Sequence, residues 1–95
     1  MFIILLKFSD NKSAVSEYMG GHNEWIKKGF EDGVFLLAGS IKSGLGGSVI
    51  ANNISSDDLE TRINSDPFVV HNVVSAETIE IEPALAEERL EFLVN

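Results

Sequence analysis

Histidine is the side chain best suited to carrying a proton near neutral pH, and this chain has two, His22 and His71. His22 falls on the apolar side of a segment where residues recur at helical spacing, away from Glu24 and Lys28. The predicted apolar stripe consists of Val15, Met19, His22, Ile26 and Phe30. In that position an imidazole can take up or deliver a proton. The alternative is a structural histidine, hydrogen-bonded at the edge of the core. His71 falls in a predicted loop, where we expect an exposed side chain.

Asp66 is the second candidate. It precedes Pro67, and proline pushes the preceding residue out of the helical region, so a rigid, extended turn presents the carboxylate. A carboxylate that accepts from one ring nitrogen of a histidine fixes the tautomer and makes the other nitrogen more basic. The alternative is that Asp66 caps or ends a helix, because aspartate is common in turns. The residues alone leave both interpretations open.

Other kinds of chemistry find less support. The chain has no cysteine, and its two histidines lie far apart, so no metal site and no metal cofactor is predicted. The glycine-rich segment 42–48 lacks the Lys-Ser/Thr ending of a phosphate loop and indicates a hairpin. A Ser-His-Asp triad through Ser40 or Ser48 can be drawn, but no nucleophile-elbow motif supports it.

Composition limits the function further. The chain has 95 residues, enough for one domain, and its formal net charge of −8 comes entirely from residues 51–95. Such a chain repels phosphate backbones, so we expect no nucleic-acid partner. Its longest apolar run, residues 1–6, is too short for a membrane span and lacks the features of a signal peptide. The absence of cysteine fits a reducing compartment, and we expect a cytoplasmic protein.

The hydrophobic pattern predicts four strands and two main helices. The first helix covers residues 15–30, as one helix or as two segments divided at Gly20-Gly21, with Ser13 as its N-cap and Gly33 at its C-terminal end. The second begins at a Ser55 cap and stops before Pro67. The strands are predicted at residues 2–6, 34–38, 48–51 and 76–82.

The order β-α-β-β-α-β predicts an α+β fold of the ferredoxin-like type, with an antiparallel sheet and two helices on one face. Pro83 is predicted to open an extra C-terminal helix, so we divide the chain into a domain of residues 1–83 and a helical tail of residues 84–95. Two of the strands are apolar on both faces, whereas the helices cover only one. We therefore expect a homodimer that packs sheet against sheet.

Several segments together resemble a known family. They are the first strand, the helix segment from His22 to Ile26, the strand at 33–39, the segment 47–50 and the Asp66-Pro67-Phe68 motif followed by residues 73–83. In this order and spacing they resemble the YCII-related domain family, which belongs to the dimeric ferredoxin-like α/β-barrel superfamily. The resemblance covers residues 1–83 and implies a dimeric α/β barrel.

The resemblance also implies a site. A His-Asp dyad in a pocket is proposed as catalytic for this family, which corresponds to His22 and Asp66 here. Gly39, Ser40 and Phe68 match positions that line the pocket, so they are the predicted substrate-binding residues. We therefore expect a cofactor-free enzyme of the lyase, isomerase or hydrolase type that acts on a small molecule. The alternatives are a binding module without turnover and a purely structural dimer.

Overall fold

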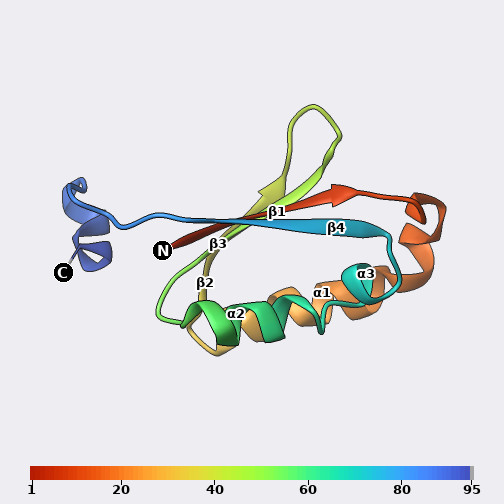
Figure 1. Cartoon of the computed structure of the whole chain (residues 1–95), viewed down its shortest axis with the longest axis horizontal. Helices are drawn as coiled ribbons and strands as arrows, with labels where there is room; N and C mark the ends of the chain where they lie inside the picture. Colours follow the sequence, from red (N-terminus) through yellow and green to blue (C-terminus); the bar gives the residue numbers. More distant parts are fainter. Residues whose placement is uncertain (95) are drawn as a thin grey trace.

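The computed structural model describes residues 1–94 and contains one four-stranded sheet with helices against one of its faces (Figure 1). The strands are β1 (Phe2–Phe8), β2 (Phe35–Ser40), β3 (Gly46–Ala51) and β4 (Val74–Glu80). The α-helices are α1 (Val15–Glu31), α2 (Ser56–Ile63) and α3 (Pro67–Val70), and two short 3-10 helices are η1 (Lys12–Ala14) and η2 (Glu88–Leu93). The four predicted strands and two main helices are thus all present.

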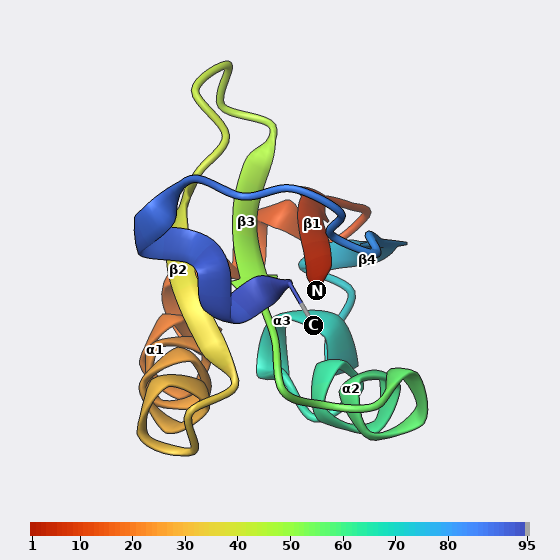
Figure 2. The ribbon, with the colours of Figure 1, turned by 90° about the vertical axis from the view of Figure 1, so that its left-hand side faces the viewer.

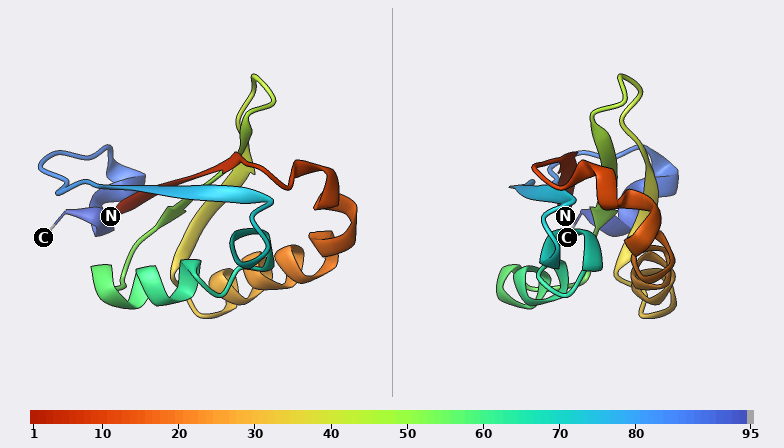
Figure 3. Two further views of the ribbon diagram at one scale, coloured as in Figure 1. Left: turned by 45° about the vertical axis from the view of Figure 1, so that its right-hand side comes forward. Right: turned by 90° about the vertical axis from the view of Figure 1, so that its right-hand side faces the viewer.

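The strands lie in the order β2-β3-β1-β4, and each neighbouring pair is antiparallel. With the succession β-α-β-β-α-β along the chain, this order is the ferredoxin-like α+β fold expected from the sequence. Figure 2 shows the four strands next to one another, with α1 and α2 side by side beneath them, and Figure 3 shows the same two-layer arrangement from the other side.

Alternation along β1 shows how the sheet separates the core from the opposite face. Phe2, Ile4 and Leu6 point toward the helices and are buried, whereas Ile3 and Leu5 are only half-buried. Successive side chains of a strand point to opposite faces, so the hydrophobic core fills the space between the sheet and the helices. The prediction that β1 is apolar on both faces is confirmed.

The face of the sheet that points away from the helices is also apolar, and we call it the outer face. Ile3 on β1 lies directly opposite Ile50 on β3 and Ile79 on β4, and Leu37 on β2 continues this row next to Ile50. Leu37 is 56% exposed and Ile79 is 43% exposed. Among residues 1–94 of the single chain, no helix covers this face (Figure 1).

Helix α1 is one continuous helix through Gly20-Gly21. Its N-cap residue is Ala14, which makes no side-chain cap bond, so the predicted Ser13 cap is wrong. Position 13 lies inside the short helix η1, which leads directly into α1 at the predicted start, Val15. At the other end Gly33 has φ +75°, the left-handed conformation of a helix-ending glycine, as predicted.

The side of α1 that is buried differs by one position from the predicted stripe. Trp25 and Gly29 are buried, whereas Met19 and Phe30, which the spacing placed toward the core, are exposed. Gly29 has no side chain, and a Cβ there would overlap the ring of Phe35. Because that ring lies directly against the helix, the glycine side of α1 faces the core and the predicted stripe turns partly to the surface.

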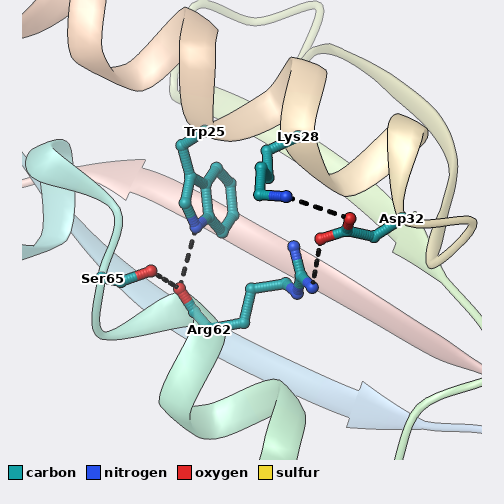
Figure 4. Close-up of polar contacts among 5 residues, drawn as sticks. All are labelled: Trp25, Lys28, Asp32, Arg62 and Ser65. Atoms are coloured by element: carbon teal, nitrogen blue, oxygen red, sulfur yellow. Dashed lines mark hydrogen bonds and ion pairs between the residues drawn. The ribbon is translucent and has the colours of Figure 1, made fainter.

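A polar cluster joins α1 to α2 (Figure 4). The Nε1 of Trp25 and the Oγ of Ser65 both donate to the carbonyl oxygen of Arg62, at 2.8 and 2.6 Å. The Arg62 guanidinium donates to Asp32 at 2.9 Å, and Lys28 donates to the other oxygen of that carboxylate at 3.2 Å. The hydrogen bond from Arg62, followed by that from Lys28, holds the pKa of Asp32 below its usual value.

Helix α2 begins and ends as predicted. The Ser55 side chain accepts from the backbone N–H of Asp58 at 3.1 Å, and the helix buries Leu59 and Ile63 before it ends. The sequence did not predict α3, which starts at Pro67. Proline fits the first position of a helix because its fixed φ suits the helix and no partner for its nitrogen is needed there.

The C-terminal segment is not the predicted helix. Pro83 opens no helix, and the segment forms only the 3-10 helix η2, which has no buried residue. The pairing of β1 with β4 ends in a bond from the N–H of Ile81 to the carbonyl of Met1, after which the chain leaves the sheet. Leu85 is 96% exposed, and Figure 1 shows η2 apart from the helices. The division at residue 83 stays a prediction, and Asn95 lies outside the described residues.

Within residues 1–94, no helix combines the length and the apolar character that crossing a bilayer requires.

Candidate active site

Asp66 is the N-cap residue of α3. Its backbone is extended, with ψ 123°, as expected of a residue before proline. Its Oδ1 accepts a hydrogen bond from the backbone N–H of Phe68 at 3.0 Å. Thus Asp66 does cap a helix, but the helix is α3 after it and not α2 before it. The Asp-Pro-Phe sequence therefore fixes the carboxylate through local backbone geometry.

His22 of α1 meets this carboxylate. The distance between the Nδ1 of His22 and the Oδ1 of Asp66 is 2.8 Å. The side chain of Asp66 is fully buried, and that of His22 is 12% exposed. Ionised groups are rarely buried without a partner, because burial removes their hydration. The two residues singled out from the sequence are 44 positions apart and form one hydrogen-bonded pair.

Aromatic rings hold the imidazole of His22 in place. The ring of Phe68 stacks on it with centroids 4.0 Å apart and planes 8° apart. The ring of Trp25 lies further off, at 6.0 Å and 23°. With Nδ1 bonded to Asp66 and one ring face covered by Phe68, the orientation of the imidazole is fixed. Nε2 is then the ring nitrogen left for a ligand.

The second carboxylate oxygen of Asp66, Oδ2, differs from Oδ1 in its surroundings. Within residues 1–94, the Oδ2 of Asp66 is buried and has no hydrogen-bond partner. Both hydrogen bonds of this side chain converge on Oδ1, one from His22 and one from Phe68. Within residues 1–94, the Asp66 carboxyl group therefore depends on His22 for its hydrogen bond to another side chain.

His22 lines a pocket between the sheet and the helices, with a volume of about 340 Å³. Gly39, Ser40 and Phe68 line the same pocket, whereas Asp66 lies behind the imidazole and is not part of the wall. The structure thus brings together all five residues predicted as a site. Their roles in catalysis and binding stay predictions.

Sequence reasoning missed several residues of this pocket. Met19, Asn23 and Ile26 line it from α1, and they fall three before, one after and four after His22. Met19 and Ile26 have the spacing of one helix face with His22, so the helical periodicity around His22 could have identified those two. Apart from Gly39, Ser40 and Phe68, the other walls come from strand residues: Leu6, Phe8, Ala38, Gly46, Gly47 and Val74.

At Gly46 the wall of the pocket is formed by the backbone, because the position has no room for a side chain. Its φ is +141°, and a Cβ there would overlap the carbonyl oxygen of Leu6. Only glycine allows β3 to begin this close to β1. As predicted, the glycine-rich segment before β3 forms a hairpin and not a phosphate loop. The carbonyl oxygen of Leu45 in this hairpin accepts a hydrogen bond from the backbone N–H of Phe8 on β1.

The two serines considered for a triad lie in different places. Ser40 lines the pocket, but within residues 1–94 no hydrogen bond joins it to His22. Ser48 donates to the carbonyl oxygen of Ile4 at 3.0 Å and does not line the pocket. The geometry therefore gives a His-Asp pair without an attached serine nucleophile.

The second histidine is not part of this site. His71 is exposed, as predicted, and its ring stacks on Tyr18 with centroids 3.9 Å apart. In the part of the chain that the structure describes, no group of three or more His, Asp or Glu side chains is arranged to hold a metal ion.

The arrangement is suited to moving a proton. An imidazole whose Nδ1 donates to a carboxylate has a free electron pair on Nε2, and the carboxylate stabilises the imidazolium that forms when Nε2 takes a proton. The ring lines a pocket with mostly apolar walls, so a small molecule bound there reaches the imidazole. Such a group can act as a general base and then as a general acid.

Comparisons with known proteins support the fold. No family model matches the chain, and no curated protein matches it. Among solved structures, it is similar to 5-chloro-2-hydroxyhydroquinone dehydrochlorinase (TftG) from Burkholderia phenoliruptrix AC1100, in complex with 2,5-dihydroxybenzoquinone, with a TM-score of 0.67. The match covers 88% of this chain and 96% of that chain at 11% identity. At this identity the likeness concerns the fold, which this chain shares with an enzyme that acts on a small molecule.

Proposed function

We propose that this protein is a cofactor-free enzyme that moves a proton on a small, partly apolar molecule, with His22 as the proton carrier and Asp66 as the residue that orients it. The observation that carries this proposal is the 2.8 Å contact between Nδ1 and Oδ1. It joins a fully buried carboxylate to an imidazole that lines a pocket. Placing an ionisable pair at the wall of a cavity is typical of catalytic sites.

In the proposed mechanism, Asp66 keeps the Nδ1 proton in place and Nε2 takes a proton from the substrate. In an elimination, the electron pair of the broken bond forms a double bond and the leaving group departs with its own pair. In an isomerisation, the imidazolium returns the proton to another atom of the substrate. In a hydrolysis, Nε2 instead takes a proton from water, the water oxygen bonds to the substrate, and the leaving group departs with the electron pair of the broken bond and takes the proton from the imidazolium. All three begin with proton uptake by Nε2, for which a positioned acid-base group contributes about 10²- to 10⁴-fold.

Three further residues are proposed to bind the substrate. The ring of Phe68 lies against His22 and offers an apolar surface next to it. Ser40 brings a hydroxyl group to the pocket, and Gly39 brings backbone with no side chain to obstruct it. The fold similarity to a dehydrochlorinase solved with a dihydroxybenzoquinone supports a hydroxylated ring as the first substrate class to examine.

The test is a turnover screen of hydroxylated rings and lactones, with 5-chloro-2-hydroxyhydroquinone among them. For a compound that is converted, His22→Ala should lower kcat/KM by at least about 10²-fold. Asp66→Ser should lower it as well, because serine can cap α3 but is too short to reach Nδ1. His71→Ala is the matched control and should keep full activity. Unchanged turnover in His22→Ala contradicts the mechanism.

The alternative is a small-molecule-binding module without turnover. It is favoured by the cap that Asp66 forms on α3, since this gives the carboxylate a structural role of its own. In that case His22 is a hydrogen-bond partner for the ligand. A compound that raises the melting temperature and is recovered unchanged after long incubation supports this alternative.

We further propose that two copies pack through their outer faces. The support is the apolar row of Ile3, Leu37, Ile50 and Ile79, which no helix covers. Burying such a row stabilises an assembly by about 25 cal/mol per Å² of apolar surface. We also propose that the chain is a member of the YCII-related family. A cytoplasmic location is a further proposal, which the absence of cysteine supports.

A further inference from the structure

Apart from His22, the polar groups of the pocket are few, and none of them carries a fixed positive charge. Apart from His22, the polar side chains among its lining residues are Asn23 and Ser40, and no lysine or arginine lines it. The remaining side chains of its walls are aliphatic or aromatic, with Leu6, Phe8 and Phe68 among them. An anionic ligand would lose hydration here without gaining a lysine or arginine partner from the walls.

One lysine, Lys12, lies against a wall residue of the pocket, and its charge is already engaged. Its Nζ lies 4.9 Å from the centroid of the Phe8 ring, which is itself a wall of the pocket. Lys12 is not among the lining residues and lies over the aromatic face. Its charge is therefore directed at the ring of Phe8 and not into the cavity.

Asn23 is the polar side chain that follows His22 on the same side of α1. It is exposed and lines the pocket, and none of the side-chain hydrogen bonds within residues 1–94 involves its amide. An asparagine amide donates through its nitrogen and accepts through its oxygen, so it can bind a hydroxyl, carbonyl or amide group. It does so without the fixed charge that would select an ion.

We propose that Asn23 determines specificity in this pocket, and that the pocket takes an uncharged ring bearing a hydroxyl, carbonyl or amide group in preference to a carboxylate or a phosphate. At about 340 Å³ the cavity is at the small end of the usual range of ligand pockets, roughly 300 to 1,000 Å³. A single substituted ring suits that size. The inference rests on this pocket being the functional site, as proposed above, but not on turnover.

The experiment compares two probes of the same shape, 4-hydroxybenzamide and 4-hydroxybenzoate, by NMR titration of the ¹⁵N-labelled protein. The amide should shift the signals of pocket residues such as Gly39 and Gly47, and should bind at least about tenfold more tightly than the carboxylate. Asn23→Leu should weaken binding of the amide about three- to tenfold, the effect of one neutral hydrogen bond. Glu24→Leu, one position along the helix and outside this pocket, is the matched control and should change nothing.

Three outcomes overturn the proposal. One is equal or tighter binding of the carboxylate, above all if Lys12→Gln then removes it. Another is an Asn23→Leu variant that binds the amide as well as the parent protein. The third is that neither probe shifts the pocket signals up to its solubility limit. Failure of the proposed enzymatic function looks different: Asp66→Ser then leaves turnover unchanged, while the preference for the uncharged probe persists.

Discussion

Pro67 of α3 lies directly against Gly21 of α1: a Cβ at position 21 would come 3.0 Å from the Pro67 Cγ. This contact joins the helix that carries His22 to the helix that Asp66 caps. The glycine costs helix stability, by roughly 1 kcal/mol relative to alanine. It allows the two helices to approach closely enough for the Nδ1 of His22 to reach Asp66.

The pair Gly20-Gly21 therefore offers a matched comparison. A Cβ at Gly20 meets nothing within 4 Å, so Gly20→Ala should raise the free energy of unfolding by about 0.5 to 1 kcal/mol. Gly21→Ala should gain less or lose stability, because Pro67 must move. Urea unfolding measures both, and equal stabilisation by the two variants would show that the close approach is unimportant.

His22 should contribute to stability as well as to chemistry. In His22→Ala the buried carboxylate of Asp66 keeps only the hydrogen bond from the Phe68 N–H. Removing one partner of a buried pair costs about 3 to 5 kcal/mol, and we expect a loss of this order in urea unfolding. Asp66→Asn should lower the free energy of unfolding less when it is introduced into His22→Ala than when it is introduced into the parent protein, because it removes the unpaired carboxylate. Fully additive losses would contradict the coupling of the two residues.

Asp32 should give the protein a pH-dependent contribution to stability. Its folded pKa is lowered from 3.8 by Arg62 and Lys28, so the contribution is fully present above that value. As the pH falls below 3.8, the contribution should decrease and disappear as the folded pKa is passed. The free energy of unfolding should therefore be measured across this pH range for the parent protein and for Asp32→Asn. The difference between the two proteins should become smaller at low pH. Asp10→Asn is the control, since Asp10 makes no ion pair within residues 1–94. A constant difference would contradict the account.

The outer face should mediate self-association. Ile79→Lys places a charge at the β4 end of the exposed apolar row and should convert the proposed dimer into a monomer in sedimentation experiments. Val70→Lys is the matched control, because Val70 is an equally apolar, exposed residue that belongs to α3 on the helix side. A parent protein that sediments as one chain would refute the dimer. Loss of the dimer in both variants would show that the outer face does not mediate it.

Much of the fold could be predicted because local patterns and global arrangement agree. The apolar run of β1, the Ser55 cap and the glycine at position 33 each indicate an element that the structure contains. The errors lie where distant contacts decide. Nothing in the local spacing showed that Phe35 packs on Gly29 and turns the buried side of α1.

The site was predictable in part for the same reason. His22 stood out because a polar residue interrupts an apolar stripe, and Asp66 because proline follows it. Their contact could not be derived from spacing, since it depends on how α3 packs on α1, and α3 was not predicted. Asn23 was missed because an exposed asparagine on a helix carries no pattern until the pocket beside it is known.

The central claim is that Asp66 holds the proton of His22 on Nδ1 and leaves Nε2 free toward the pocket. The most direct test is the tautomer of the neutral His22 ring, read from long-range ¹H–¹⁵N correlations, with exposed His71 as the internal reference. We predict the Nδ1–H form in the parent protein and loss of that preference in Asp66→Ser. A neutral ring protonated on Nε2 in the parent protein, or a tautomer that Asp66→Ser leaves unchanged, would contradict the account.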